Sequence, residues 1–92
     1  MGTKNTPGAF AGYANAAPDE PMFVLLARDD RAPLLVSIWA HVSNNDFDGA
    51  RIEFEKLDAF CRQRKRSHIE KVYEALDVAD AMREWRRKDT PA

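Results

Sequence analysis

The chain contains only one cysteine, Cys61, among its 92 residues. A single cysteine can form neither an internal disulfide nor, by itself, a zinc site, so the usual supports of a very small domain are excluded. No apolar run approaches the roughly 20 residues of a membrane span, and the first residues lack the apolar stretch of a signal peptide. We therefore expect a cytoplasmic protein without a membrane segment.

A strong charge of one sign is also missing, because the formal net charge is only -1. Hydrophobic residues make up 45% of the chain and aromatic residues 10%, which is enough apolar surface for collapse and argues against wholesale disorder. A length of 92 residues leaves room for one hydrophobic core and not for two. These numbers indicate a single small domain.

Residues 1–20 differ in composition from the rest, since they hold three of the four glycines and five alanines. They show no apolar periodicity, and this predicts a flexible tail before a domain at 21–89, with 90–92 as a second tail. Phe10 and Tyr13 are either docking anchors or ordinary tail residues. The remaining core of about 70 residues seldom supplies more than about 3–5 kcal/mol, so we expect a homo-oligomer.

The segment 22–27 is a short, uninterrupted apolar run that follows Pro21 and ends at Arg28. Its length and its Phe and Val content favour a strand or extended segment. A lone strand has unpaired edges, so such a strand would pair with its copy in a second subunit. The alternative is a first helix that opens at residues 19–21.

Three helices are predicted after this segment, which makes the fold class mainly α. The first covers 31–43, because Pro33 suits a first helical turn, Asp30 can cap it, and apolar residues recur at helical spacing. A polar turn at 43–46 separates it from a second helix at 46–66. The apolar positions of these two helices are Leu34, Leu35, Ile38, Trp39, Val42, Phe47, Ala50, Phe54, Leu57 and Cys61.

The third helix is predicted at 68–88, with a broad apolar arc that implies contact with two elements or with another subunit. Ser67 and Glu70 form a capping-box pattern that favours a break before it, although one continuous rod is the alternative. The residues expected in the core are Trp39, Phe54, Leu57 and Leu76. The residues expected at an interface are Phe23, Leu25, Met82 and Trp85, of which Met82 and Trp85 belong to types enriched in interfaces.

Positive charge gathers in the last third of the chain, where residues 60–92 carry nine cations and six acids. The candidate site for phosphate or another anionic ligand is the cluster Arg62, Arg64, Lys65, Arg66, His68 and Lys71. A second basic group lies at 83–88. Both clusters sit at predicted helix ends, where cations also complement the helix dipole, and a pI near 6.1 argues against a dedicated DNA-binding domain.

Catalytic groupings are not apparent in the sequence, so we expect neither an enzyme nor a cofactor. Cys61 and His68 lie two turns apart on a continuous helix, but Cys61 continues an apolar stripe and suits a small buried residue better. A row of carboxylates at 70–80 could collect a cation, although neighbouring Lys and Arg neutralise it more simply. There is no glycine-rich phosphate loop, metal motif or nucleophile elbow.

Two stretches of the sequence resemble a known family. EPMFVLLARD at 20–29, with APLLV at 32–36 and Trp39, is similar to the opening of small uncharacterised phage and proteobacterial prophage proteins. KVYEALDVADAMREW at 71–85 resembles their closing helix, whereas 44–66 looks like an expansion of the family's shorter connection. The resemblance implies a phage or prophage setting, hence the host cytoplasm, and carries over no catalytic or binding residue.

We expect from these observations a non-catalytic phage accessory protein that acts by binding. The partner is either a protein or a sequestered small anionic ligand such as a nucleotide, and antagonism of host defence is one role that fits. The alternative is a small nucleic-acid-binding regulator that uses the basic cluster at 62–71.

Overall fold

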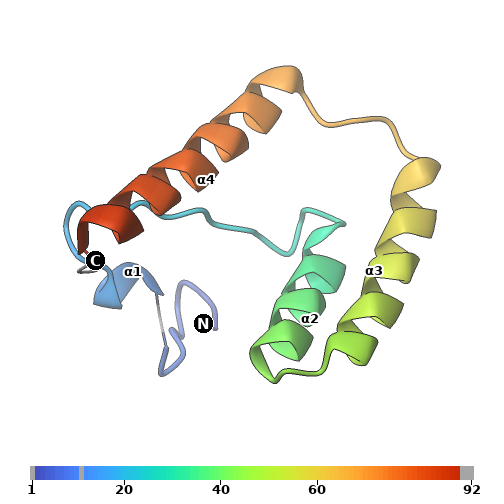
Figure 1. The fold of residues 1–92 in the computed structure, drawn as a ribbon, viewed down its shortest axis with the longest axis horizontal. Coiled ribbons are helices and arrows are strands. Elements are labelled where there is room, and N and C mark those ends of the chain that lie inside the picture. The colour runs from blue at the N-terminus through green and yellow to red at the C-terminus, as the bar shows by residue number, and fades with distance from the viewer. Residues whose placement is uncertain (1, 11, 90–92) are drawn as a thin grey trace. The chain divides into compact units, whose positions relative to one another are not determined.

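The computed structural model describes residues 2–10 and 12–89 and is mainly helical (Figure 1). Its four helices are α1 (Gly12–Asn15), α2 (Ala32–Ser43), α3 (Phe47–Arg62) and α4 (Ile69–Asp89). The described residues contain no strand, only an isolated bridge between Gly2 and Pro7. The predicted mainly helical fold class is confirmed. The chain divides into two compact units, residues 24–68 and a second unit formed by the residues up to 23 and from 69 onward.

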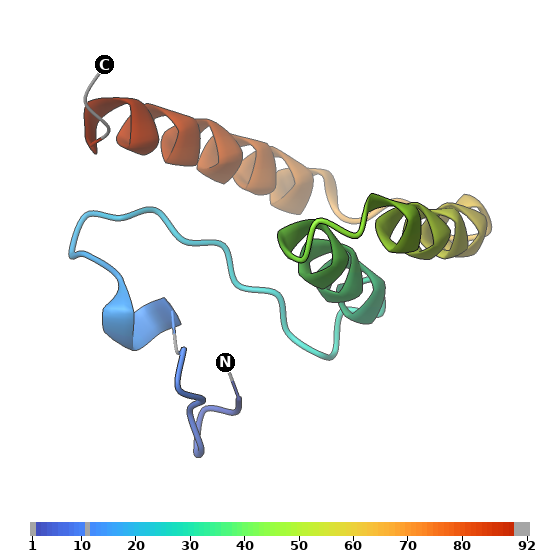
Figure 2. The same ribbon diagram turned by 60° about the horizontal axis from the view of Figure 1, so that its bottom comes forward.

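The unit at 24–68 is built on a hairpin of α2 and α3, which run side by side in opposite directions (Figures 1 and 2). Ala32 and Ala50 are its buried residues, with Leu34, Ile38 and Leu57 half-buried. Small side chains at the buried positions let two helices approach closely, and the half-buried aliphatic residues fill the seam. The hairpin is therefore held by a narrow seam and not by a broad core.

The turn between α2 and α3 is tight because two caps overlap in it. Asn45 has a positive φ of 57°, the left-handed conformation that ends many helices. Its N–H donates to the carbonyl of Val42 at 3.0 Å, and the Asp46 N–H donates to the carbonyl of His41 at 2.8 Å. This pair of bonds is a Schellman motif, and it satisfies carbonyls that the end of α2 would leave unpaired.

The start of α2 differs from the prediction that Asp30 caps it. The N-cap position is Arg31, whose side chain makes no capping bond, and Pro33 lies in the first turn as expected. Asp29 accepts the Arg31 N–H at 3.0 Å, whereas the Asp30 carboxylate pairs with Arg64. Asp30 is thus unavailable as a cap because Arg64, which follows α3 at the same end of the hairpin, takes its carboxylate.

The second helix ends earlier than predicted, at Arg62 instead of residue 66, and a non-helical connection at 63–68 follows. The alternative of one continuous rod is therefore wrong. Arg62 and Arg66 would lie four residues apart on one helix face, where like charges repel. In addition, the Lys65 carbonyl accepts a hydrogen bond from the Arg31 guanidinium at 3.2 Å. Charge repulsion and this competing donor both favour a non-helical backbone after Arg62.

The second unit consists of α4 and the N-terminal segment. α4 begins at Ile69, one residue after the predicted start, and its half-buried positions recur at helical spacing: Val72, Ala75, Val78, Ala79, Met82 and Trp85. The predicted tail 1–20 carries the four-residue helix α1 and a turn in which the Thr6 N–H donates to the Thr3 hydroxyl. The predicted tail 90–92 lies outside the described residues.

The segment predicted as a strand or helical turn at 22–27 is neither. Residues 21–26 have no regular secondary structure and residue 27 enters a turn, so the predicted strand is wrong. No strand elsewhere in the described ranges is present to pair with it. Its backbone N–H and C=O groups therefore have no neighbouring strand with which to form a sheet.

Three of the four residues expected in the core are exposed in the isolated chain. Trp39, Phe54 and Leu76 expose 63%, 57% and 57% of their surface, and only Leu57 is half-buried. The prediction identified the helical stripes but assigned too wide an arc of each helix to the interior. One neighbouring helix covers only a narrow stripe, so the flanks of α2 and α3 stay uncovered.

Candidate interaction surface

The outer flank of α2 presents large apolar side chains to solvent. Leu35, Trp39 and Val42 follow one another at steps of four and three residues, which places them on one stripe of the helix. α2 contains no Asp, Glu, Lys or Arg at all. A helix that lacks charge all round is typical of a buried position. Contact with α3 covers only one side of it.

α3 contributes a matching stripe. Phe47 and Phe54 lie seven residues apart and expose 60% and 57% of their surface. Each residue turns the helix by about 100°. The stripe of α2 is therefore rotated by about 120° around the helix axis from the side of α2 that contacts α3. The stripe of α3 points about 90° to the same side of the hairpin. We call these five residues the hairpin apolar face: Leu35, Trp39, Val42, Phe47 and Phe54.

The opposite side of the hairpin carries polar contacts beside the exposed Ile52. Lys56 and Glu53 form an ion pair at 3.0 Å. Hydrogen bonds from Lys56 and then from Ser37 lower the pKa of Glu53, and the nearby His41 acts in the same direction. Ser37 and His41 belong to α2, so this face joins the two helices through polar contacts. It has the character of a surface that faces water.

A compact polar cluster lies at the turn between α2 and α3. One Asp46 carboxylate oxygen accepts the Gly49 N–H at 3.0 Å and caps α3, while the other lies 3.0 Å from His41 Nδ1. These bonds, first that of Gly49 and then that of His41, lower the pKa of Asp46. A Cβ at Gly49 would lie 2.7 Å from His41 Nδ1 and would collide with the Asp46 carboxylate. Glycine at 49 therefore makes room for the pair.

Two arginines of the basic cluster that is predicted as an anion site form ion pairs within the protein. Arg62 donates from Nε to both oxygens of Asp58 at 3.0 Å. Arg64 pairs with Asp30 and lies over the Phe60 ring, 5.0 Å from its centroid. Two of the guanidinium groups are thus already matched by carboxylates of the same unit, which reduces the charge available to a phosphate.

The rest of the basic cluster is divided between the two units. Lys65, Arg66 and His68 are exposed along the connection, and Lys71 belongs to the other unit, in α4. Arg31 binds this connection twice, through the Lys65 carbonyl and through the Ser67 hydroxyl, each at 3.2 Å. These two bonds hold the connection against the start of α2.

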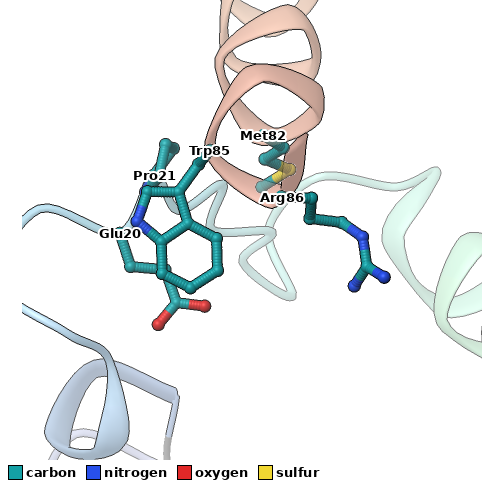
Figure 3. A pocket seen from close by; sticks show the side chains of 5 residues that line it. All are labelled: Glu20, Pro21, Met82, Trp85 and Arg86. Carbon is teal, nitrogen blue, oxygen red and sulfur yellow. The ribbon is translucent and has the colours of Figure 1, made fainter. Parts of the chain in front are cut away.

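Two residues predicted at an interface meet the N-terminal segment within the second unit. Met82 and Trp85 of α4, together with Arg86, line a shallow hollow of about 220 Å³ with Glu20 and Pro21 (Figure 3). The Trp85 indole lies beside Pro21 and Glu20, and the Arg86 guanidinium extends away from them. The other two predicted interface residues, Phe23 and Leu25, are exposed and half-buried. Their role at an interface stays a prediction.

Three cations of the second basic group pair with carboxylates of α4. Arg83 pairs with Asp80 at 2.7 Å, and Arg87 and Lys88 pair with Glu84. Cys61 and His68 do not lie on one continuous helix, because α3 ends at Arg62. Across the described ranges, no three His, Cys, Asp or Glu side chains gather as metal ligands would.

The hairpin apolar face is the feature that the sequence reasoning missed. Its residues were recognised as apolar but were assigned to the core or left unplaced. The signal that could have identified it is the complete lack of Asp, Glu, Lys and Arg over 32–43. One neighbouring helix covers only one side of such a segment, so apolar residues must remain on its other sides.

None of the helices in the described part of the chain is long and apolar enough to cross a membrane. Comparison with known proteins finds no family model that matches the chain, and neither a curated protein nor a solved structure to which it is similar.

Proposed function

We propose that this protein is a non-catalytic binding protein that associates with a protein partner through the hairpin apolar face. The observation that carries the proposal is the set of exposed apolar side chains on one side of α2 and α3, with Trp39 at 63% exposure. Contiguous apolar patches of several hundred Å² mark interaction sites on small proteins. Aromatic residues such as Trp39 and Phe54 are also the types enriched at the centres of interfaces.

A protein partner is favoured over a nucleic acid or a small anion. Arg62 and Arg64, which would supply the strongest phosphate contacts, are paired with Asp58 and Asp30. From the resemblance of 20–29 and 71–85 to small phage and prophage proteins, we also propose a phage or prophage setting, with the protein acting in the host cytoplasm. The nucleic-acid regulator is the weaker candidate, since its cluster is partly neutralised.

Site-specific photocrosslinking tests the proposal on the full chain. A photoreactive benzophenone residue replaces Phe54 on the apolar face, and in a matched chain it replaces Lys56, which is exposed on the polar side of the same helix. After irradiation of bacterial cells that produce each chain, antibody detection reports covalent adducts above the chain mass of 10.5 kDa.

We expect discrete adducts from position 54 and none from position 56. Mass spectrometry of an adduct then identifies the captured protein. Equal labelling at both positions, or no adduct at position 54, would show that the apolar face does not bind a protein and would overturn the proposal.

A further inference from the structure

We infer that the occupant of the hairpin apolar face is a second copy of the same chain, so that two α2–α3 hairpins form a four-helix bundle. The inference rests on the proposed function and names the partner of that surface. It commits to a symmetric dimer in which the same five residues of each protomer face one another.

The isolated chain lacks the interior that a folded protein of this size needs. Among the described residues only Ala32 and Ala50 are buried apolar residues, and no large side chain is fully buried. Folding must offset roughly 1–2 kcal/mol of backbone entropy for each ordered residue, and two alanines cannot supply this. Apolar surface has to be buried elsewhere, and the largest supply in the hairpin is its apolar face.

The chemistry of the face suits contact with itself. In a two-fold dimer each patch meets an identical patch, so a patch of one charge sign would repel its copy. None of the five residues carries a charge, and all of α2 is free of Asp, Glu, Lys and Arg. A face of this kind can meet its copy without electrostatic cost.

The exposed area is at the lower end of what stable interfaces bury, which is about 600–1,000 Å² on each partner. With Phe47, Phe54 and Trp39 exposed by 60%, 57% and 63%, and with Leu35 and Val42 beside them, the face offers about 500–600 Å² of side-chain surface. A standard interface buries about 800 Å² on each partner. The half-buried seam residues Leu34, Ile38 and Leu57 border the face and can supply part of the difference.

The polar groups of the hairpin form the solvent-facing surface of the dimer. Glu53, Lys56 and Ser37 bind one another on the side opposite to the apolar face, and His41 and Asp46 bind one another at the turn. When two such hairpins stack with their apolar sides together, these groups stay in water. Two-layer packing of antiparallel helix pairs around an apolar seam is the architecture of four-helix bundles.

The test measures the mass of the purified full chain by light scattering over a range of concentrations. We expect twice 10.5 kDa at high micromolar concentration, with dissociation on dilution. Phe54 lies midway along α3 on the apolar face, so Phe54→Lys and Phe54→Glu are each expected to stay monomeric. An equimolar mixture of the two variants is expected to recover the doubled mass, because opposite charges then meet near the two-fold axis.

Ile52→Lys is the matched control. Ile52 is 55% exposed on α3 but lies about 160° around the helix from Phe54, so this variant is expected to dimerise like the wild type. Circular dichroism reports whether each variant retains its helices. Because the mixture is made from the same two chains, recovery of the doubled mass excludes misfolding as the cause of dissociation.

A monomeric wild type at high micromolar concentration would overturn the inference, as would a dimer that Phe54→Lys leaves intact. These results differ from failure of the proposed function. If the wild type is monomeric but crosslinks from position 54 to a different protein, the apolar face is a binding surface with another occupant. If position 54 gives no adduct at all, both proposals fail.

Discussion

His41 and Asp46 are joined twice across the turn of the hairpin. The Asp46 N–H donates to the His41 carbonyl at 2.8 Å, and the Asp46 carboxylate lies 3.0 Å from His41 Nδ1. Asp46 also caps α3 through the N–H of Gly49, so one residue ends one helix and begins the next. The relative direction of α2 and α3, and with it the position of the apolar face, depends on this junction.

Replacement Asp46→Asn separates capping from charge, because asparagine is as good an N-cap as aspartate. The pKa of Asp46 is lowered from its ordinary value of 3.8, first by the bond from Gly49 and then by His41. A carboxyl group with a lowered pKa adds stability that is present above its unfolded pKa and is lost as pH falls through the folded pKa. We therefore expect the variant to melt below the wild type at neutral pH and the difference to shrink as the pH falls below 3.8.

Thermal melts at one fixed protein concentration, followed by circular dichroism, measure this difference. Asp48→Asn is a suitable control, since Asp48 is an exposed carboxylate in the first turn of the same helix. A difference between wild type and Asp46→Asn that stays constant from neutral pH to acid would contradict the role of the Asp46 charge.

Asn45 is the position where the turn requires a left-handed residue. Its φ of 57° costs most side chains about 1–2 kcal/mol, while glycine adopts it freely. We expect Asn45→Ala to lower the free energy of unfolding by about that amount and Asn45→Gly to leave it unchanged or raise it. Urea unfolding curves of the three proteins provide the comparison, and an alanine variant as stable as the glycine variant would show that the turn rearranges.

Arg31 is expected to protect the connection at 63–68 from proteolysis. Arg31→Gln removes both 3.2 Å bonds, to the Lys65 carbonyl and the Ser67 hydroxyl, and should increase the rate of tryptic cleavage after residues 64–66 several-fold. Arg28→Gln removes an exposed cation and one trypsin site in the same way and serves as the control. Peptide mass spectrometry over time gives both rates, and equal rates would mean that the two bonds do not order the connection.

The basic cluster is expected not to bind duplex DNA. The triple replacement Arg62→Gln, Lys65→Gln and Arg66→Gln should cost at most about 1 kcal/mol of stability, since the pair between Arg62 and Asp58 is exposed. Neither the wild type nor this variant should form a salt-sensitive complex in a fluorescence anisotropy titration. A submicromolar wild-type complex that weakens steeply with salt and disappears in the triple variant would restore the nucleic-acid regulator as the better function.

The sequence was sufficient to predict local structure where local chemistry decides it. The helical spacing of apolar residues placed three helices to within a few residues, and the polar run at 43–46 located the turn. The ion pair between Asp58 and Arg62, four residues apart, depends on helical spacing alone. These features depend on residues within one or two turns of one another.

Tertiary contacts decided the rest. Asp30 is the nearest capping residue before α2, yet its carboxylate binds Arg64, 34 positions away, and so does not cap the helix. Arg31 binds residues 65 and 67, and α3 ends before them instead of at the predicted residue 66. Spacing alone identified the apolar stripes that contain Trp39 and Phe54, but how much of each stripe is buried depends on how many elements pack against it. One partner helix covers one seam, and for that physical reason the remaining apolar residues form a surface instead of a core.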